Sequence, residues 1–93
     1  MSNTSSTLNS FIKGVMTLKT IDECYKFFGD ICTDAELIKM AERLSIAKLL
    51  YEGKTYREIL EITDTSNIRI ARVKRVLEKE HSALLEVVKR TSK

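Results

Sequence analysis

The chain has 93 residues, of which 43% are hydrophobic and 31% are charged, so it is long enough for one folded domain and too apolar for a disordered segment. It contains no proline, no tryptophan and three glycines, a composition that favours helices. The formal net charge of +3 is only mildly basic, so binding to an anionic partner depends on local clustering of cations rather than on the total.

The N-terminal third predicts a short tail followed by two helices. The first seven residues, MSNTSST, are small and polar, and we expect a flexible tail over residues 1–7 before a single helical domain over residues 8–93. Apolar residues recur at helical spacing from Leu8 onward. A second helix is expected from Thr20, because Thr20 and Glu23 match the S/T-x-x-E capping box. Its apolar stripe comprises Ile21, Tyr25, Phe27, Phe28, Ile31 and Cys32.

A longer third helix is expected next. The same capping signal recurs at Thr33 and Glu36 and predicts a helix through about Glu52. Gly53 can end this helix, because glycine adopts the left-handed conformation without a steric penalty. The face of the helix that we expect to be buried consists of Leu37, Met40, Ala41, Leu44, Ala47, Leu50 and Tyr51.

Three shorter helices are expected after Gly53. Thr55 and Glu58 form a third capping box, which begins a helix of two turns ending near Ile62. Ser66 begins the next helix, and a final amphipathic segment contains Leu84, Leu85, Val87 and Val88. No strand pattern occurs, so the sequence predicts an all-α fold with about six helices.

Residues 55–79 have the pattern of a helix-turn-helix, in which the first helix crosses the DNA backbone and the second enters the major groove. From Lys54 to Lys79 there are seven cations and four acids, and the segment from Ser66 to Leu77 has four cations and no acid. At about 100° per residue, the second helix has an apolar side and an opposite, basic side. The apolar side holds Ile70, Val73 and Leu77, and the basic side holds Asn67, Ile68, Ala71, Arg72 and Arg75.

The basic side carries groups that can read DNA. Ile68 can contact a thymine methyl group, Asn67 can read adenine, and the arginines can read guanine or neutralise phosphates. The small Ala71 lets the helix approach the groove floor. Thr55 and Arg57 begin the first helix, where free backbone N–H groups also attract phosphates. The predicted DNA-binding residues are Thr55, Arg57, Ser66, Asn67, Ile68, Arg69, Ala71, Arg72 and Arg75.

Three alternatives stay open for this basic helix. It can be a solvated surface helix packed by Ile70 and Val73, since exposed apolar residues such as Ile68 are common. It can belong to a protein-interaction module that retains the helix-turn-helix as a packing unit and faces an acidic partner. It can also bind nucleic acid without sequence preference, with a steep salt dependence but no preferred operator.

The sequence offers little for catalysis or metal binding. It has no glycine-rich phosphate loop, zinc-ligand spacing or nucleophile–base pair, so we expect no enzymatic activity, no cofactor and no metal. Cys24 and Cys32 on one helix would lie ~12 Å apart, too far for a disulfide, and free thiols suit a reducing cytosol. There is no signal peptide and no apolar run of ~18 residues, so we expect a cytoplasmic protein that does not enter a membrane.

Residues 40–77, MAERLSIAKLLYEGKTYREILEITDTSNIRIARVKRVL, resemble the Trp repressor superfamily, and the resemblance extends over roughly residues 8–80. The run LKTIDECYKFFGDICTDAELIKMAERLSIAKLLYEGKTYREI is similar to its TrpR-like branch of small bacterial proteins, often called YerC/YecD. The resemblance implies an all-helical transcriptional regulator that binds double-stranded DNA as a homodimer with interlocked N-terminal helices. The apolar excess of residues 8–50 fits such a dimer.

The sequence departs from the family pattern in the turn of the helix-turn-helix. Such turns usually have glycine at the position of Asp64, where a positive φ is common, and we expect Asp64 to adopt it with some strain. The preceding position, usually apolar, is Thr63. We expect Ile62 to supply the missing packing.

A second departure concerns a ligand. By the resemblance, the two arginines and the glycine that hold tryptophan in the Trp repressor correspond to Glu42, Arg72 and Val73. Glu42 repels the carboxylate of an amino acid, and Val73 fills the space left by glycine, so we expect no tryptophan binding. The sequence identifies no other small-molecule effector.

Overall fold

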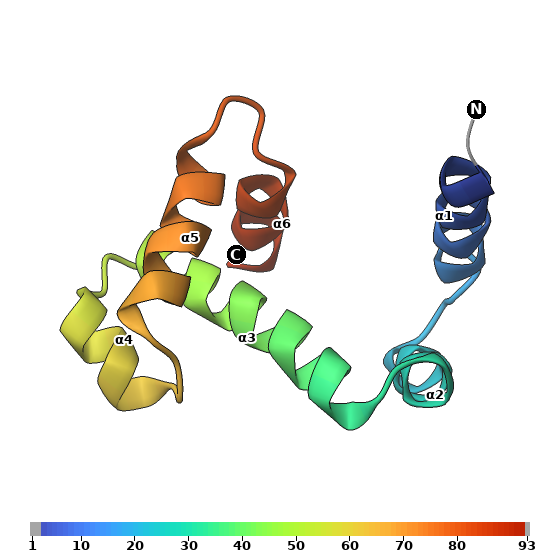
Figure 1. Ribbon diagram of the computed structural model, residues 1–93, viewed down its shortest axis with the longest axis horizontal. Coiled ribbons are helices and arrows are strands. Elements are labelled where there is room, and N and C mark those ends of the chain that lie inside the picture. Colours follow the sequence, from blue (N-terminus) through green and yellow to red (C-terminus); the bar gives the residue numbers. More distant parts are fainter. Residues whose placement is uncertain (1–2, 93) are drawn as a thin grey trace. The chain divides into compact units, whose positions relative to one another are not determined.

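The computed structural model describes residues 3–92 of the chain. Within this range there are six helices and no strand, which confirms the predicted all-α fold (Figure 1). None of these helices is both long and apolar enough to cross a membrane. The helices are α1 (Asn3–Val15), α2 (Ile21–Ile31), α3 (Asp34–Tyr51), α4 (Tyr56–Ile62), α5 (Asn67–Glu78) and α6 (Ala83–Thr91).

The first helix begins earlier than the sequence indicated. Residues 3–7 are already helical, so the prediction of a flexible tail is wrong for them, while Met1 and Ser2 lie outside the described residues. Once the apolar turns from Leu8 onward have formed a helix, each residue added at its end gains a backbone hydrogen bond at little further cost. Small polar residues can therefore extend it.

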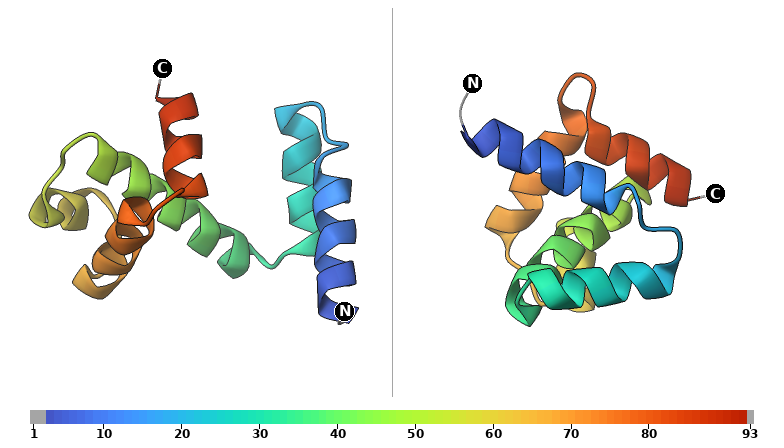
Figure 2. Two further views of the ribbon diagram at one scale, coloured as in Figure 1. Left: turned by 90° about the horizontal axis from the view of Figure 1, so that it is seen from above. Right: turned by 90° about the vertical axis from the view of Figure 1, so that its right-hand side faces the viewer.

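The chain divides into two compact units, one up to Leu37 and one from Ile38, where the sequence predicted a single domain. In the first unit, α1 and α2 lie side by side (Figure 2), and they contact each other through three aromatic rings. The ring centroids of Phe11 lie 6.0 Å from Phe27 and 6.5 Å from Phe28. These contacts hold the two helices together locally, which explains why they form a unit of their own.

The second unit has a small core that holds the helix-turn-helix to its neighbours. Six hydrophobic residues are buried, and α3, α4, α5 and α6 each contribute at least one of them. Tyr56, Leu77 and Leu84 pack against this core while half-exposed. The buried residues are Ile46, Ala47, Ile59, Ile70, Val73 and Val88.

The buried face of α3 differs from the predicted one. Ile46, which the prediction omitted, is 1% exposed, whereas Met40 and Tyr51 remain 43% and 47% exposed. Ala41 is exposed as well. Apolar residues occur on several sides of this helix, so helical spacing alone cannot show which side meets the core. Leu44 and Ala47 do lie on the predicted side.

Gly53 ends α3 as predicted. Its φ is +88°, the left-handed region that favours glycine. The N–H of Gly53 donates to the carbonyl of Leu50, and the N–H of Lys54 donates to the carbonyl of Leu49, both at 3.0 Å. This pair of bonds satisfies carbonyls that the helix leaves open and turns the chain into α4.

Candidate nucleic-acid interface

The first helix of the helix-turn-helix, α4, starts with the predicted capping box. The hydroxyl of Thr55 accepts the N–H of Glu58 at 3.1 Å, and the Glu58 carboxylate accepts the N–H of Thr55 at 2.9 Å. Both N–H groups are therefore used inside the protein. At this end of α4, the Thr55 hydroxyl can still donate its proton, and the guanidinium of Arg57 is exposed, so both groups can contact a phosphate.

The same capping box gives the helix-turn-helix a pH dependence. The hydrogen bonds from the backbone and side chain of Thr55 lower the pKa of Glu58 below its ordinary value of 4.5. The folded state therefore binds this proton less readily than the unfolded state. The resulting stabilisation is complete above pH 4.5 and is lost as the pH falls through the lowered pKa.

We expect Glu58→Gln to weaken the acid dependence of stability. The free energy of unfolding, measured by denaturant titration between about pH 6 and pH 3, should fall less steeply in the variant than in the native chain, because glutamine has no proton to gain. Glu36 has the same arrangement with Thr33 and a lowered pKa, so Glu36→Gln tests the same effect in another helix. Superimposable pH profiles for all three proteins would contradict the expectation.

The turn between α4 and α5 lacks the positive φ that the sequence predicted at Asp64. Within the described residues, positive φ occurs only at Gly53 and His81. Instead, Thr63 leaves α4 in extended backbone, and both its N–H and its hydroxyl donate to the carbonyl of Ile59 at 2.9 Å. The chain thus leaves the helix without a left-handed residue, and no strain at Asp64 is required.

The packing expected from Ile62 is also absent. Its side chain is 59% exposed, whereas Ile59, one turn earlier, is fully buried in the core. The packing of α4 on the other helices therefore depends on Ile59 rather than on Ile62.

The second helix, α5, has the two sides that its sequence predicted. Ser66 caps it, with the hydroxyl accepting the N–H of Arg69 at 3.3 Å. Ile70 is fully buried and Val73 is 6% exposed, while Ile68 is 75% exposed. Asn67, Arg72 and Arg75 are exposed beside Ile68, and Ala71 is half-buried. The exposed side of α5 is thus basic, with a large apolar residue in its first turn.

Packing on both flanks fixes the orientation of α5. The helix contacts both α4 and α6, and Figure 1 shows it lying between these two helices. The ammonium group of Lys74 also lies 5.9 Å from the centre of the Tyr56 ring, a cation–π contact that joins α5 to the start of α4. The basic side is therefore presented by a rigid element.

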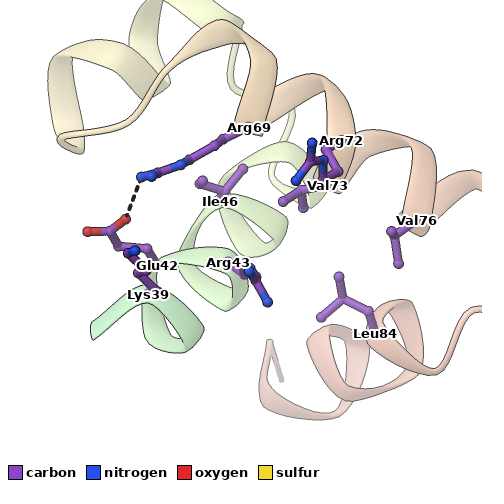
Figure 3. A pocket seen from close by; sticks show the side chains of 9 residues that line it. All are labelled: Lys39, Glu42, Arg43, Ile46, Arg69, Arg72, Val73, Val76 and Leu84. Atoms are coloured by element: carbon purple, nitrogen blue, oxygen red, sulfur yellow. Dashed lines mark ion pairs between the residues drawn. The ribbon is translucent and has the colours of Figure 1, made fainter. Parts of the chain in front are cut away.

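A cavity of about 600 Å³ lies between α3, α5 and α6 (Figure 3). Four of its lining residues are cations and one is an acid. Glu42, Arg72 and Val73, matched to the tryptophan site by resemblance, all line this cavity. The lining residues are Lys39, Glu42, Arg43, Ile46, Arg69, Arg72, Val73, Val76 and Leu84.

An ion pair crosses this cavity. The Arg69 guanidinium on α5 lies 3.5 Å from the Glu42 carboxylate on α3, and Figure 3 shows the two side chains pointing toward each other. Sequence reasoning assigned Arg69 to DNA and Glu42 to a lost ligand contact, and it missed their pairing. Nothing local in the sequence marks a contact between residues this far apart along the chain.

The chain is similar to known proteins over most of its length. Residues 6–92 match the Trp repressor protein family, and the chain belongs to that family. The uncharacterized protein YerC of Bacillus subtilis (strain 168) is 43% identical over 70 residues, covering 75% of this chain and 67% of YerC. These two findings confirm the resemblance found in the sequence.

Solved structures show the same fold. The crystal structure of a TrpR like protein from Eubacterium eligens ATCC 27750 has a TM-score of 0.87 and 33% identity, covering 94% of this chain and 90% of that one. A second crystal structure, from Staphylococcus aureus, has the same TM-score and identity, and the match covers 94% of this chain and 87% of that one. The fold is therefore that of TrpR-like proteins.

Family membership makes tryptophan the first ligand to test. We expect millimolar tryptophan to leave the melting temperature unchanged, because Glu42 places a carboxylate in the cavity where the ligand needs a cation. A ligand that binds the folded state raises the melting temperature by mass action. A rise of several degrees would therefore show that tryptophan binds the folded protein and would contradict the expectation.

Proposed function

We propose that this protein is a sequence-specific, homodimeric DNA-binding regulator of transcription in the bacterial cytoplasm, with no catalytic role. The observation that carries the proposal is the exposed side of α5. Ile68, 75% exposed, stands among cations on a helix whose other side is anchored in the core, within a family named for a repressor. In the major groove, a thymine methyl group would give this exposed isoleucine an apolar contact.

Each residue has a distinct part in the proposed complex. Asn67, Ile68 and Ala71 face base edges, with Ala71 permitting close approach to the groove floor. Arg72 and Arg75 contact guanines or phosphates. Around them, Thr55, Arg57 and Ser66 contact phosphates through their hydroxyl and guanidinium groups, and Arg69 provides a further cation.

Selection from a random duplex library at near-physiological salt tests the proposal. We expect an enriched palindrome whose half-sites lie ~10 bp apart, or a multiple of this, because a two-fold dimer presents two copies of α5. Retention without enrichment indicates a nonspecific nucleic-acid binder. No retention favours a protein-interaction module with a retained helix-turn-helix.

Replacing Arg72 with alanine should weaken operator binding. If Arg72 contacts a phosphate, affinity should fall equally for all DNA sequences, and the salt dependence of log K should be shallower by about one. If Arg72 contacts a base, the binding free energy should weaken by about 1–3 kcal/mol, and the preference at one base pair of the operator should be relaxed. Arg90→Ala is a matched control, because Arg90 is an exposed arginine on α6. Equal effects of the two substitutions would show that only total charge matters.

A further inference from the structure

The ion pair between Glu42 and Arg69 is unlike the other ion pairs among the described residues. The pairs Asp22–Lys26, Arg57–Glu61 and Glu80–His81 each join neighbours along one stretch of chain. The Glu42–Arg69 pair instead joins α3 to α5. It therefore connects the core of the second unit to the helix that we propose to enter the major groove.

The surroundings of the pair favour its formation. The Glu42 side chain is 29% exposed and that of Arg69 is 51% exposed, whereas the carboxylate side chains of the other three pairs are 71–90% exposed. Shielding from water strengthens attraction between charges. Glu42 is the one acid among the residues that line this cavity, and Lys39, Arg43 and Arg72 are its other charged lining residues besides Arg69.

The position of Arg69 determines what the pair does. Arg69 is the third residue of α5, in the turn that reaches the bases of DNA in a helix-turn-helix. A cationic side chain raises the affinity of a protein for DNA, because it neutralises a phosphate and releases the counterion of that phosphate. A guanidinium held by Glu42 must first leave that carboxylate, so the ion pair and a phosphate compete for the same group.

We propose that Glu42 restrains Arg69 inside the cavity and thereby limits the affinity of this protein for DNA. The inference rests on the proposed DNA-binding function and adds a residue that never touches DNA yet sets the strength of binding. Arg69 contributes to the complex only to the extent that the ion pair opens. When the Glu42 carboxylate is removed, all cations of α5 are available to DNA.

Two substitutions of Glu42 separate this restraint from a general charge effect. Glu42→Gln removes the negative charge. Glu42→Asp keeps the net charge but draws the carboxylate back from Arg69 by one methylene. With the operator recovered by selection, we expect both variants to bind about two- to fivefold more tightly, since an ion pair of this kind competes by roughly that factor. The slope of log K against log salt concentration should become steeper by about 0.9, the value expected for one additional phosphate contact.

Substitution of Arg69 completes a double-mutant cycle. We expect Glu42→Gln to give no gain in operator affinity when it is made in an Arg69→Ala background, because coupled residues give non-additive effects. Glu86→Gln, which neutralises an exposed acid on α6, measures the general charge effect. Thermal melts of every variant establish that the folded protein is being compared.

The outcomes are distinct. A gain that persists without Arg69, or that Glu86→Gln reproduces, overturns the restraint in favour of overall charge. Weaker binding by Glu42→Gln and Glu42→Asp overturns it in favour of a pair that positions α5. In either case the proposed DNA-binding function stands. Failure of the native protein and of all variants to retain any DNA overturns both proposals.

Discussion

Replacing Ile70 with alanine is expected to lower the free energy of unfolding by about 2–5 kcal/mol. Ile70 is fully buried and lies in the core with Ile46, Ile59 and Val88. The truncated side chain leaves a cavity at the point where helices α3, α4, α5 and α6 meet. Small domains have total stabilities of only about 5–15 kcal/mol, so this single change removes much of what holds the helix-turn-helix together.

Ile68 provides the matched control, because the same substitution is made two residues away on the same helix. Its side chain is 75% exposed, so Ile68→Ala should change the free energy of unfolding by less than about 0.5 kcal/mol. Operator affinity should nevertheless fall, since the thymine contact is lost. Urea denaturation followed by circular dichroism, at one protein concentration for all variants, measures the stability. Comparable destabilisation by both substitutions would mean that α5 packs through the other side.

The contrast between these two isoleucines shows what local sequence can reveal. Residues spaced about three to four apart share one side of a helix, so the buried side of α5 followed from the pattern alone. Capping boxes are similarly local, and the bonds predicted at Thr33 and Thr55 are present. At Thr20 the hydroxyl accepts the predicted N–H, but the Glu23 carboxylate accepts the N–H of Lys19 instead.

The sequence-based predictions were wrong or incomplete where the structure depends on contacts between helices. Helix α3 has apolar residues on several sides, and only the assembled core shows that Ile46 is buried while Tyr51 is exposed. The turn at Asp64 was expected to have the positive φ of the family pattern. Instead, Thr63 ends α4 in extended backbone, and its hydroxyl donates a hydrogen bond to the carbonyl of Ile59. The Glu42–Arg69 pair depends on how α3 and α5 pack. The helical periodicity of a sequence carries no information about the distance between residues on two different helices.

The exposed apolar residues of α1 and α2 lead to the second large effect, a change of oligomeric state. Although the phenylalanine rings bring these helices together, large apolar side chains remain in water. Ile21 and Tyr25, on one side of α2, are 77% and 72% exposed. A second copy of the chain can cover this surface, as the proposed homodimer requires. The other large apolar residues exposed in this part of the chain are Leu8 and Ile12 on α1, Met16 directly after α1, and Ile31 on α2.

We expect light scattering to give the native protein a mass twice that of its 10.6 kDa chain, and to give the double variant Ile21→Asp/Tyr25→Asp the mass of one chain. Two carboxylates in an apolar interface lose their hydration without gaining partners, so association becomes unfavourable. Operator affinity should fall by about 10²–10⁴-fold, because the two half-sites are no longer bound by one linked molecule.

Lys19→Gln/Lys26→Gln is the appropriate control, since it changes the net charge by the same −2 while leaving the apolar side intact. Lys26 forms an exposed pair with Asp22, whose loss costs little. This variant should stay dimeric and bind the operator with at most a modest loss. A dimer that survives both aspartates would place the interface elsewhere on the chain. A native protein that is monomeric at all concentrations would remove the basis for a palindromic operator, because a single α5 can read only one half-site.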